Sequence, residues 1–218
     1  MSSPGWGRRR GPRVVVTAGP TREYVDPVRF LSNESSGRMG FAIARAAARA
    51  GCRTTLISGP VTLETPGGVR RVDVVSAREM LAAVREAFEG ADALYMCAAV
   101  ADWRPARRLA GKWRAKDGGS RRVSLELVRN PDILATVARR KGERLVVGFA
   151  LETGSGLRRA RAKMARKGAD YIVLNDSSAL NARRASVRIL GRDGSRRELA
   201  DQGKDRIARA LVKLCVER

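Results

Sequence analysis

Residues 13–50 read RVVVTAGPTREYVDPVRFLSNESSGRMGFAIARAAARA, and this stretch decides the fold. An apolar run at 13–17 leads through a long connection containing glycine and serine into an alanine-rich run with helical spacing. In α/β proteins such a connection forms an anion site, because free N–H groups at the helix N-terminus point at the ligand and the helix dipole favours negative charge. The glycines do not follow the dinucleotide or P-loop spacing. We therefore expect a phosphate-binding connection of another kind.

Short apolar runs alternate with helical patterns along the rest of the chain. Further strands are expected at 53–57, 91–96, 145–149 and 171–174, and helices at 37–50, 77–88, 132–139, 157–167 and 204–216. This alternation predicts an α/β protein with a Rossmann-like, three-layer αβα architecture and a mostly parallel sheet. Segments 186–190 and 196–199, separated by a turn, predict a small C-terminal β-hairpin. Alternation at 123–128 indicates a half-exposed strand.

The length of 218 residues is enough for one domain with a substantial core. We expect residues 1–12 to be a disordered basic N-terminal tail and not a secretory signal, and residues 13–218 to form a single domain. The polar, basic segment at about 103–122 has no apolar period, so it is predicted to be a mobile flap. No apolar run is long enough to span a membrane.

The composition excludes several chemistries. The chain has no histidine and its three cysteines have no C-x-x-C spacing, so histidine-dependent triads are excluded and we expect no zinc site. Cys52, Cys97 and Cys215 lie in apolar contexts and are expected to be reduced thiols of a cytoplasmic protein. A formal charge of +22 indicates anionic ligands. Because the basic residues are dispersed, we favour a polyphosphate ligand over a dedicated nucleic-acid function, and we expect no membrane partner.

Parallel sheets bind ligands beyond the carboxyl ends of their strands, so the segments after the strands are the candidate site. After 13–17, the pattern favours a phosphate cradle of Gly19, Ser35, Gly37 and Gly40 over a serine N-cap with loop glycines. After 91–96, small residues would let a ligand lie close to the backbone, and Asp102 could hold a substrate hydroxyl, an amide or Mg²⁺. Tight packing followed by an N-cap aspartate is an equally good interpretation there.

Three further motifs are ambiguous by themselves. Asn130-Pro131-Asp132-Ile133 is more typical of a helix start than of a ligand site. Phe149 could stack on a base, and Lys163 and Lys167 share a helical face that could clamp a triphosphate. The pattern alone favours a simpler interpretation, in which Phe149 is a core residue and the two lysines lie on a solvated basic face. Asn175 follows a strand and is a loop residue by default, but a ligand contact by position.

Taken in order, these motifs resemble the phosphopantothenate–cysteine ligase family, also called phosphopantothenoylcysteine synthetase. The resemblance extends from about residue 13 to the C-terminus. It rests on the block at 17–40, on AAVADW at 98–103, on NPDI at 130–133, on GFALET at 148–153 and on ND at 175–176. In many bacteria this domain is the C-terminal half of a bifunctional protein with a flavin-dependent decarboxylase. No decarboxylase half is in this chain, so the resemblance implies no flavin here and makes a separate decarboxylase a candidate partner.

The resemblance implies a ligase that joins 4′-phosphopantothenate to L-cysteine on the route to coenzyme A. Bacterial members use CTP: the carboxylate attacks the α-phosphate to give an acyl-cytidylate and pyrophosphate, and cysteine then displaces CMP. Mg²⁺ (or Mn²⁺) and a homodimer with shared active sites are implied as well. Chemistry of this kind needs mainly positioning and charge stabilisation, which fits a site without histidine.

Roles carry over residue by residue. Asn33 and Lys112 match catalytic positions, with Asn33 also binding phosphopantothenate and the acyl-phosphate intermediate, and Lys112 lying on the flap. Asp102 matches a phosphopantothenate position and is also a candidate for the nucleotide and the metal, and Arg29 matches an arginine offered to the neighbouring subunit. The remaining phosphopantothenate positions are Ala98 and Ala99. The remaining nucleotide positions are Gly19, Ser35, Gly37, Gly40, Asn130, Asp132, Ile133, Phe149, Lys163, Lys167 and Asn175.

The chain departs from the family at several positions, and two rivals remain. The flap reads KWRAK at 112–116, so Lys112 competes with Lys116 for the role of flap lysine. Leu151 replaces a small residue near the expected nucleotide, and the choice between CTP and ATP stays open. One rival is an NAD(P)-dependent reductase on the same fold, although no G-x-G-x-x-G follows the first strand. The other is a nucleic-acid-binding module driven by the positive charge.

Overall fold

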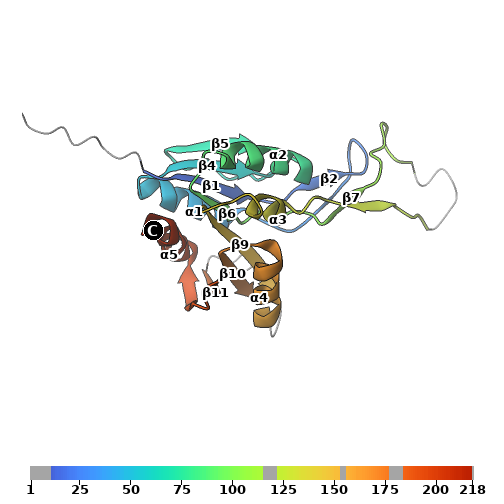
Figure 1. Ribbon diagram of the computed structural model, residues 1–218. Helices are drawn as coiled ribbons and strands as arrows, with labels where there is room; N and C mark the ends of the chain where they lie inside the picture. The colour runs from blue at the N-terminus through green and yellow to red at the C-terminus, as the bar shows by residue number, and fades with distance from the viewer. Residues whose placement is uncertain (1–10, 115–121, 153–155, 177–183, 218) are drawn as a thin grey trace, which may run out of the picture.

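The middle layer of the protein is an eight-stranded sheet in the order β12-β11-β10-β9-β6-β1-β4-β5 (Figure 1). The computed structural model describes residues 11–114, 122–152, 156–176 and 184–217. The six strands β10, β9, β6, β1, β4 and β5 run parallel to their neighbours. The two remaining pairs, β10–β11 and β11–β12, are antiparallel. The bounds are β1 Arg13–Ala18, β4 Arg53–Ser58, β5 Val69–Asp73, β6 Ala93–Met96, β9 Leu145–Glu152, β10 Tyr171–Asp176, β11 Arg184–Gly191 and β12 Arg196–Gly203.

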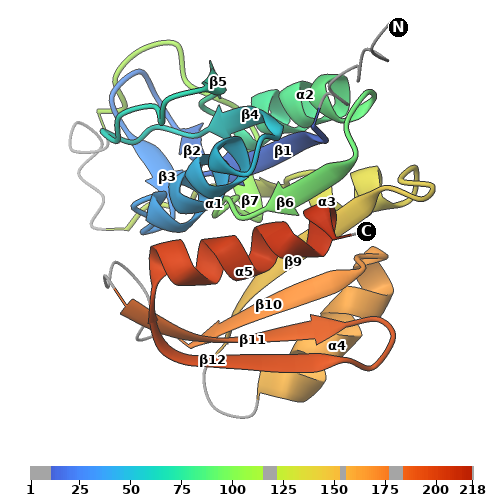
Figure 2. The ribbon, with the colours of Figure 1, turned by 90° about the vertical axis from the view of Figure 1, so that its left-hand side faces the viewer.

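Helices cover both faces of the sheet (Figure 2). One face carries α1 (Arg38–Arg49) and α5 (Lys204–Val216), whose buried side chains form one core cluster with the sheet. The other face carries α2 (Ala77–Phe88), α3 (Ile133–Ala138) and α4 (Gly156–Lys167), which form a second cluster. The predicted fold class is therefore confirmed: a three-layer αβα protein with a mostly parallel sheet and a C-terminal β-hairpin.

The short strands β2 (Arg22–Tyr24), β3 (Phe30–Ser32) and β7 (Trp103–Pro105) and one strand of the main sheet were missed, and one strand prediction is wrong. The edge strand β5 was not predicted, because its sequence VRRVD carries charged side chains, as exposed sheet edges commonly do. The strand expected at 123–128 is wrong in its bounds, since only Leu127–Arg129 (β8) pairs, with Trp103–Pro105 (β7). Alternation there indicates side chains on two faces but does not supply a neighbouring strand, and Val123 remains 58% exposed.

The predicted tail and flap lie partly outside the described residues. Residues 1–10 are not described, whereas the carbonyls of Gly11 and Pro12 accept hydrogen bonds from the Arg53 side chain and backbone, respectively. Of the predicted flap, residues 115–121 are not described, and residues 103–114 begin with β7. In the described part of the chain, no helix is long and apolar enough to cross a membrane.

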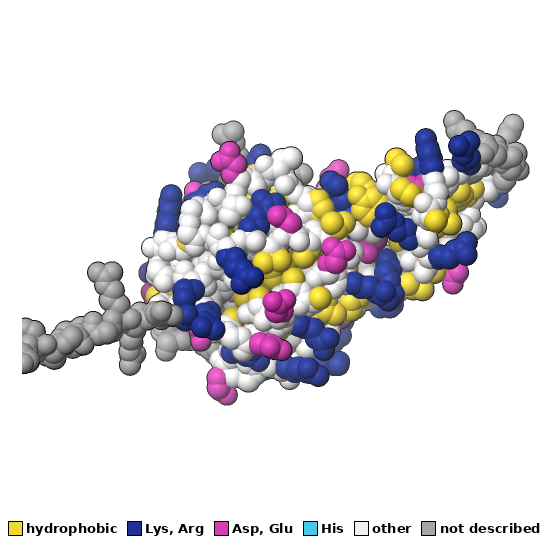
Figure 3. All heavy atoms as spheres, turned by 90° about the horizontal axis from the view of Figure 1, so that it is seen from above, with side chains coloured by type: hydrophobic (Ala, Val, Ile, Leu, Met, Phe, Trp, Pro, Cys, Tyr) yellow, Lys and Arg dark blue, Asp and Glu magenta, His cyan; other side chains and the backbone are white. Residues whose placement is uncertain are grey.

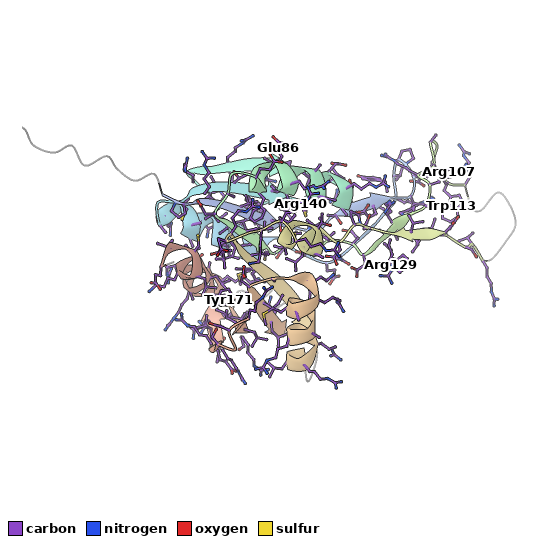
Figure 4. The ribbon with its side chains drawn as sticks, viewed as in Figure 1. Glu86, Arg107, Trp113, Arg129, Arg140 and Tyr171 are labelled. Carbon is purple, nitrogen blue, oxygen red and sulfur yellow. The ribbon has the colours of Figure 1, made fainter. Side chains whose placement is uncertain are left out.

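A projecting arm extends beyond the sheet, and we define it as residues 22–32, 103–114 and 122–129 (Figure 1). It contains the hairpin of β2 (Arg22–Tyr24) and β3 (Phe30–Ser32) and the β7–β8 pair. The Leu109 N–H donates to the Val25 carbonyl at 2.8 Å, which ties the segment after β7 to the hairpin. Figure 4 shows Arg107, Trp113 and Arg129 on this arm, whereas its other labelled side chains belong to the main body of the molecule.

A buried carboxylate, Asp26, organises the arm. It accepts hydrogen bonds from the Val28, Arg29 and Trp113 N–H groups at 2.7, 2.7 and 3.0 Å, and it pairs with the Arg29 guanidinium at 3.2 Å. Burial acts to raise the pKa of Asp26, but the hydrogen bonds and the Arg29 charge outweigh it and hold that pKa below its ordinary value. The carboxylate therefore stays ionised and fixes the segment at 112–114 against the hairpin.

The tyrosine of β6 ties helix α5 to the sheet. Tyr95 is fully buried, and its hydroxyl donates to the Leu211 carbonyl of α5 at 2.9 Å. We expect Tyr95→Phe to lower the free energy of unfolding by about 1 kcal/mol, because a buried carbonyl loses a donor. Urea denaturation measures this. Tyr171→Phe is the matched control, since the Tyr171 hydroxyl makes no hydrogen bond to a described residue. An equal loss of unfolding free energy in both variants would contradict a stabilising role for the Tyr95–Leu211 hydrogen bond.

Candidate active site

Two cavities lie at the carboxyl ends of the parallel strands, one on each face of the sheet. Cavity 1, of about 340 Å³, lies on the α1/α5 face and is bordered by the N-terminus of α1, the end of β6 and the ends of β9 and β10. Cavity 2, of about 440 Å³, lies on the face of α3 and α4. The two cavities share the residues of the sheet edge, which are Ala98, Val100, Asp102, Phe149 and Lys163. A ligand can therefore extend from one face to the other across this edge.

The predicted phosphate cradle forms one wall of cavity 1. Ser35, Gly37 and Gly40 line it, and α1 begins there with no side chain capping its free N–H groups. Gly37 is the N-cap with φ of 73°, a conformation that other residues rarely adopt. A Cβ at Gly40 would lie 2.5 Å from the Ala18 Cβ, so glycine lets α1 approach β1 closely. Gly19 does not line either cavity but supports the wall, because its carbonyl accepts from Ala99 N–H at 2.9 Å.

Two buried threonines hold the loop after β6 in place. The Thr17 hydroxyl accepts a hydrogen bond from Ala98 N–H at 3.0 Å, and the Thr21 hydroxyl accepts one from Ala101 N–H at 3.0 Å. Both threonines are fully buried. The loop therefore presents Ala98, Ala99 and Asp102 to cavity 1, and Asp102 is exposed at the rim of both cavities. Sequence reasoning missed the two threonines, since their partners lie about 80 residues away.

The NPDI motif forms the floor of cavity 2 together with the basic face of α4. Asn130, Asp132 and Ile133 all line it, as do Lys163 and Lys167. Asn130 also has a structural task, because its amide donates to the Ala101 carbonyl at 2.9 Å. Asp132 caps α3 by accepting from Ala135 N–H at 3.0 Å and forms an ion pair with Lys167. The motif therefore both starts helix α3 and lines cavity 2.

The ionisation of Asp132 gives a pH-dependent contribution to stability. Burial acts to raise its pKa, but hydrogen bonds from Lys167 and Ala135 and the positive charges nearby hold the pKa below its ordinary value. Because the pKa of Asp132 is lower in the folded protein, its ionised form stabilises the fold at pH values above the unfolded-state pKa of about 3.9. This stabilisation is lost as the pH falls through the folded-state pKa. Asp132→Ala is therefore expected to cost about 1 kcal/mol at pH 7, mainly as a lost cap, and less below about pH 3. Denaturant midpoints at both pH values test this; a pH-independent difference would contradict it.

Phe149 and Asn175, towards the carboxyl ends of β9 and β10, and Lys163 of α4 lie around cavity 1. The Lys163 ammonium donates to the Phe149 carbonyl at 2.7 Å, which places this lysine at the edge shared by both cavities. Asn175 has a buried Oδ1 with no hydrogen-bond partner among the described residues. Unpaired buried acceptors are rare, so this atom suits a ligand N–H donor.

Three predicted site residues on or beside the arm do not line either cavity of this protomer. Asn33 is exposed at the rim of cavity 1, where its Nδ2 donates to the Ala99 carbonyl at 3.4 Å. Lys112 is exposed next to Trp113, whose N–H is fixed by Asp26. Arg29 is bound to Asp26 and to the Trp113 carbonyl at 2.7 Å. The competing Lys116 lies outside the described residues.

Cavity 1 also contains charged residues that the motifs did not indicate: Arg38, Lys204 and Glu34. Cys97 lines the cavity too, and burial raises the pKa of its thiol to about 12 although Lys204 opposes this, so it stays a neutral thiol. For a metal, the available carboxylates of cavity 1 are Asp102 and Glu34. Among the described residues there is no cluster of three His, Cys, Asp or Glu side chains. This donor set fits Mg²⁺ bound jointly with ligand phosphates and does not form an all-protein cage.

Outside the cavities the positive charge is dispersed. Seen from above, Lys and Arg side chains are scattered over the surface with Asp and Glu side chains among them (Figure 3). The distribution favours a discrete anionic ligand in a cavity over a continuous track for a nucleic-acid backbone.

Comparison with known proteins gives the family. Residues 9–218 match the family described as the DNA/pantothenate metabolism flavoprotein C-terminal domain. The chain belongs to this family. It is 43% identical over 213 residues to the coenzyme A biosynthesis bifunctional protein CoaBC of Vibrio cholerae, covering 95% of this chain and 53% of the relative. It is 46% identical over 188 residues to the Escherichia coli K12 protein of the same name, covering 84% and 46%.

A solved structure supports the same assignment. The crystal structure of the C-terminal domain of CoaBC superposes with a TM-score of 0.81 at 38% identity, covering 94% of both chains. The present chain spans about half the length of the curated relatives it matches. The resemblance drawn from the ordered motifs is thereby confirmed for this DNA/pantothenate metabolism flavoprotein C-terminal domain.

Proposed function

We propose that this chain is a ligase that joins 4′-phosphopantothenate and L-cysteine into 4′-phosphopantothenoyl-cysteine in coenzyme A biosynthesis, with CTP activating the carboxylate. The observation that carries the proposal is the pair of cavities that meet at Asp102 and Phe149, with an uncapped helix N-terminus on one side and the Lys163/Lys167 face on the other. Such a site suits a nucleotide that spans the sheet edge next to a second anionic substrate. Its membership in the family of the CoaBC relatives supports the same assignment.

The reaction balances in two displacements. A carboxylate oxygen of phosphopantothenate attacks the α-phosphorus, the bond to the β-phosphate bridging oxygen breaks, and pyrophosphate leaves. The cysteine amine then attacks the acyl carbon, the bond to the cytidylate oxygen breaks, and CMP leaves as the ammonium proton passes to water. The α1 N–H groups and cationic side chains stabilise the negative charge that develops on phosphate oxygens. Asn33, at the rim beside Ala99, orients the acyl group, and Lys112 neutralises the α-phosphate.

A bound Mg²⁺ (or Mn²⁺) would neutralise the triphosphate, and Asp102 with Glu34 would hold it together with phosphate oxygens. Asp102 would alternatively hold polar groups of the pantothenate. No flavin is part of the proposal. A separate decarboxylase would receive the amide product, and we propose that the protein acts in the cytoplasm.

We propose a homodimer in which the arm of one subunit completes the site of the other. The arm exposes apolar side chains unusually strongly, including Val28 at 60% and Trp103 at 43%. Exposed apolar surface of this kind is typical of an interface. The arm also carries Arg29 and Lys112, which do not line the cavities of their own protomer. A second subunit would bring these cations to a site that one chain leaves incomplete.

The decisive test is product formation with each of the four nucleoside triphosphates. The protein is incubated with phosphopantothenate, cysteine, Mg²⁺ and one triphosphate, and the amide is detected by mass. We expect the amide to form with CTP. If it forms with ATP only, the protein is still a ligase but prefers ATP to CTP.

Two results would replace the proposal. Absence of amide with all four nucleotides, together with tight NADPH binding, favours a reductase on this fold. Submicromolar binding of a random oligonucleotide at physiological salt with a steep salt dependence favours a nucleic-acid module.

A further inference from the structure

Lys204 is a cation of cavity 1 that no motif indicated. It is the first residue of α5, it directly follows β12, and its half-buried side chain lines the cavity with Arg38 and Cys97. Arg38 is likewise the first residue of its helix, α1. Two helices on the same face of the sheet therefore begin at cavity 1, each with a cation at its first position.

The position of Lys204 at the start of α5 is electrostatically unfavourable in the absence of an anion. The positive end of a helix dipole lies at its N-terminus, where a cation is destabilising. Neither helix has a side chain capping its first N–H groups. Burial and the Arg38 charge lower the pKa of Lys204, as expected for a cation next to a like charge.

Nothing described around Lys204 offsets its charge. The next residue, Asp205, points elsewhere and pairs with Arg45 at 3.2 Å. Cys97 is a neutral thiol, and no ion pair joins Lys204 to a carboxylate among the residues that the structure describes. The carboxylates of the cavity, Glu34 and Asp102, lie in the connections that follow β3 and β6, and neither forms an ion pair with Lys204. A polyanion is the partner that complements the Lys204 ammonium and the N-termini of α1 and α5.

We infer that Lys204 binds the polyphosphate of the nucleotide in cavity 1, together with the cradle formed by Ser35 and Gly37. The inference rests on the proposed function for the identity of the nucleotide, but not for the phosphate contact. In that function Lys204 would neutralise charge on the phosphates that leave as pyrophosphate. It would act alongside the α1 N-terminus, and a nucleoside monophosphate would make less use of it.

The test measures the affinity of Lys204→Met for inorganic tripolyphosphate, CTP, CDP and CMP by calorimetry. We expect the Kd for tripolyphosphate and CTP to rise about 10- to 100-fold, as for loss of one charged hydrogen bond, and the Kd for CMP to change least. Lys204→Arg should restore most of the affinity. Lys213→Met is the matched control, because Lys213 lies on the same helix and pairs with Glu217 at 3.4 Å. Thermal melting of each variant checks that it is folded.

The outcomes separate this inference from the proposed function. Equal affinity of Lys204→Met and Lys213→Met for tripolyphosphate and CTP overturns the inference, as does an equal loss for CMP and CTP, while amide synthesis by the unaltered protein would still support the ligase. Conversely, a Lys204-dependent tripolyphosphate affinity in a protein that makes no amide supports the phosphate site and removes the proposed function. Failure of the unaltered protein to bind either polyphosphate overturns the inference as well.

Discussion

Asn33→Asp is expected to reduce amide formation about 100- to 1000-fold while CTP still binds and pyrophosphate is still released. The Asn33 amide lies at the rim of cavity 1 and donates to the Ala99 carbonyl. Aspartate has the same shape, but it lacks the N–H donor and places a negative charge next to Glu34 and the anionic acyl group. The activated intermediate would then form but react poorly with cysteine. Separate measurement of pyrophosphate and CMP release distinguishes the two steps.

Lys112→Gln provides the opposite signature. Loss of this charge is expected to slow pyrophosphate release itself, because the α-phosphate loses a neutralising cation during the first displacement. A variant at Asn33 that slows both steps equally, or a Lys112 variant with unchanged kinetics, would contradict the role assigned to that residue.

Gly40→Val is expected to lower the free energy of unfolding by about 2–4 kcal/mol and to abolish measurable nucleotide binding. A Cβ at this position would lie 2.5 Å from the Ala18 Cβ and 2.8 Å from the Thr17 carbonyl oxygen. Helix α1 must therefore move away from β1, and its N-terminal wall of cavity 1 moves with it. Urea denaturation and calorimetric titration with CTP measure the two effects.

The control for this prediction is Gly67→Val. A Cβ at Gly67 would meet no atom within 4 Å, and its backbone is not in the left-handed region. If Gly67→Val lowers the free energy of unfolding as much as Gly40→Val does, the effect at Gly40 reflects the general cost of replacing glycine with valine and not a clash with β1. Retention of nucleotide binding in Gly40→Val would contradict the place of α1 in the site.

Local periodicity was enough to predict the layers of the fold. Buried strands such as β1 and β6 are continuous apolar runs, and α2 and α5 have apolar faces, so each was recognisable within its own segment. The edge strand β5 was missed because its arginines carry no such pattern. Of the arm, residues 103–122 were predicted only as a flap and the β2–β3 hairpin was missed, since Asp26 fixes Trp113 across a large separation in sequence.

The candidate site was predictable where chemistry and position coincide in one motif. Ser35, Gly37, Asp102 and Asn175 line cavity 1 as the strand-end rule and the resemblance implied. Lys204 was not predictable, because it starts an ordinary amphipathic helix, and only the fold brings α5 next to α1. Thr17 and Thr21 were missed for the same reason, since their hydroxyls act on a loop from another βα unit.

The most direct test of the central claim follows oxygen atoms through the reaction. Phosphopantothenate labelled with ¹⁸O in its carboxylate is converted with CTP and cysteine, and the nucleotide and phosphate products are analysed by mass. If the carboxylate attacks the α-phosphate, one ¹⁸O passes to CMP, whose mass rises by about 2 Da, and the pyrophosphate stays unlabelled. Label in inorganic phosphate or pyrophosphate, with unlabelled nucleotide, would contradict an acyl-cytidylate and with it the account of this site.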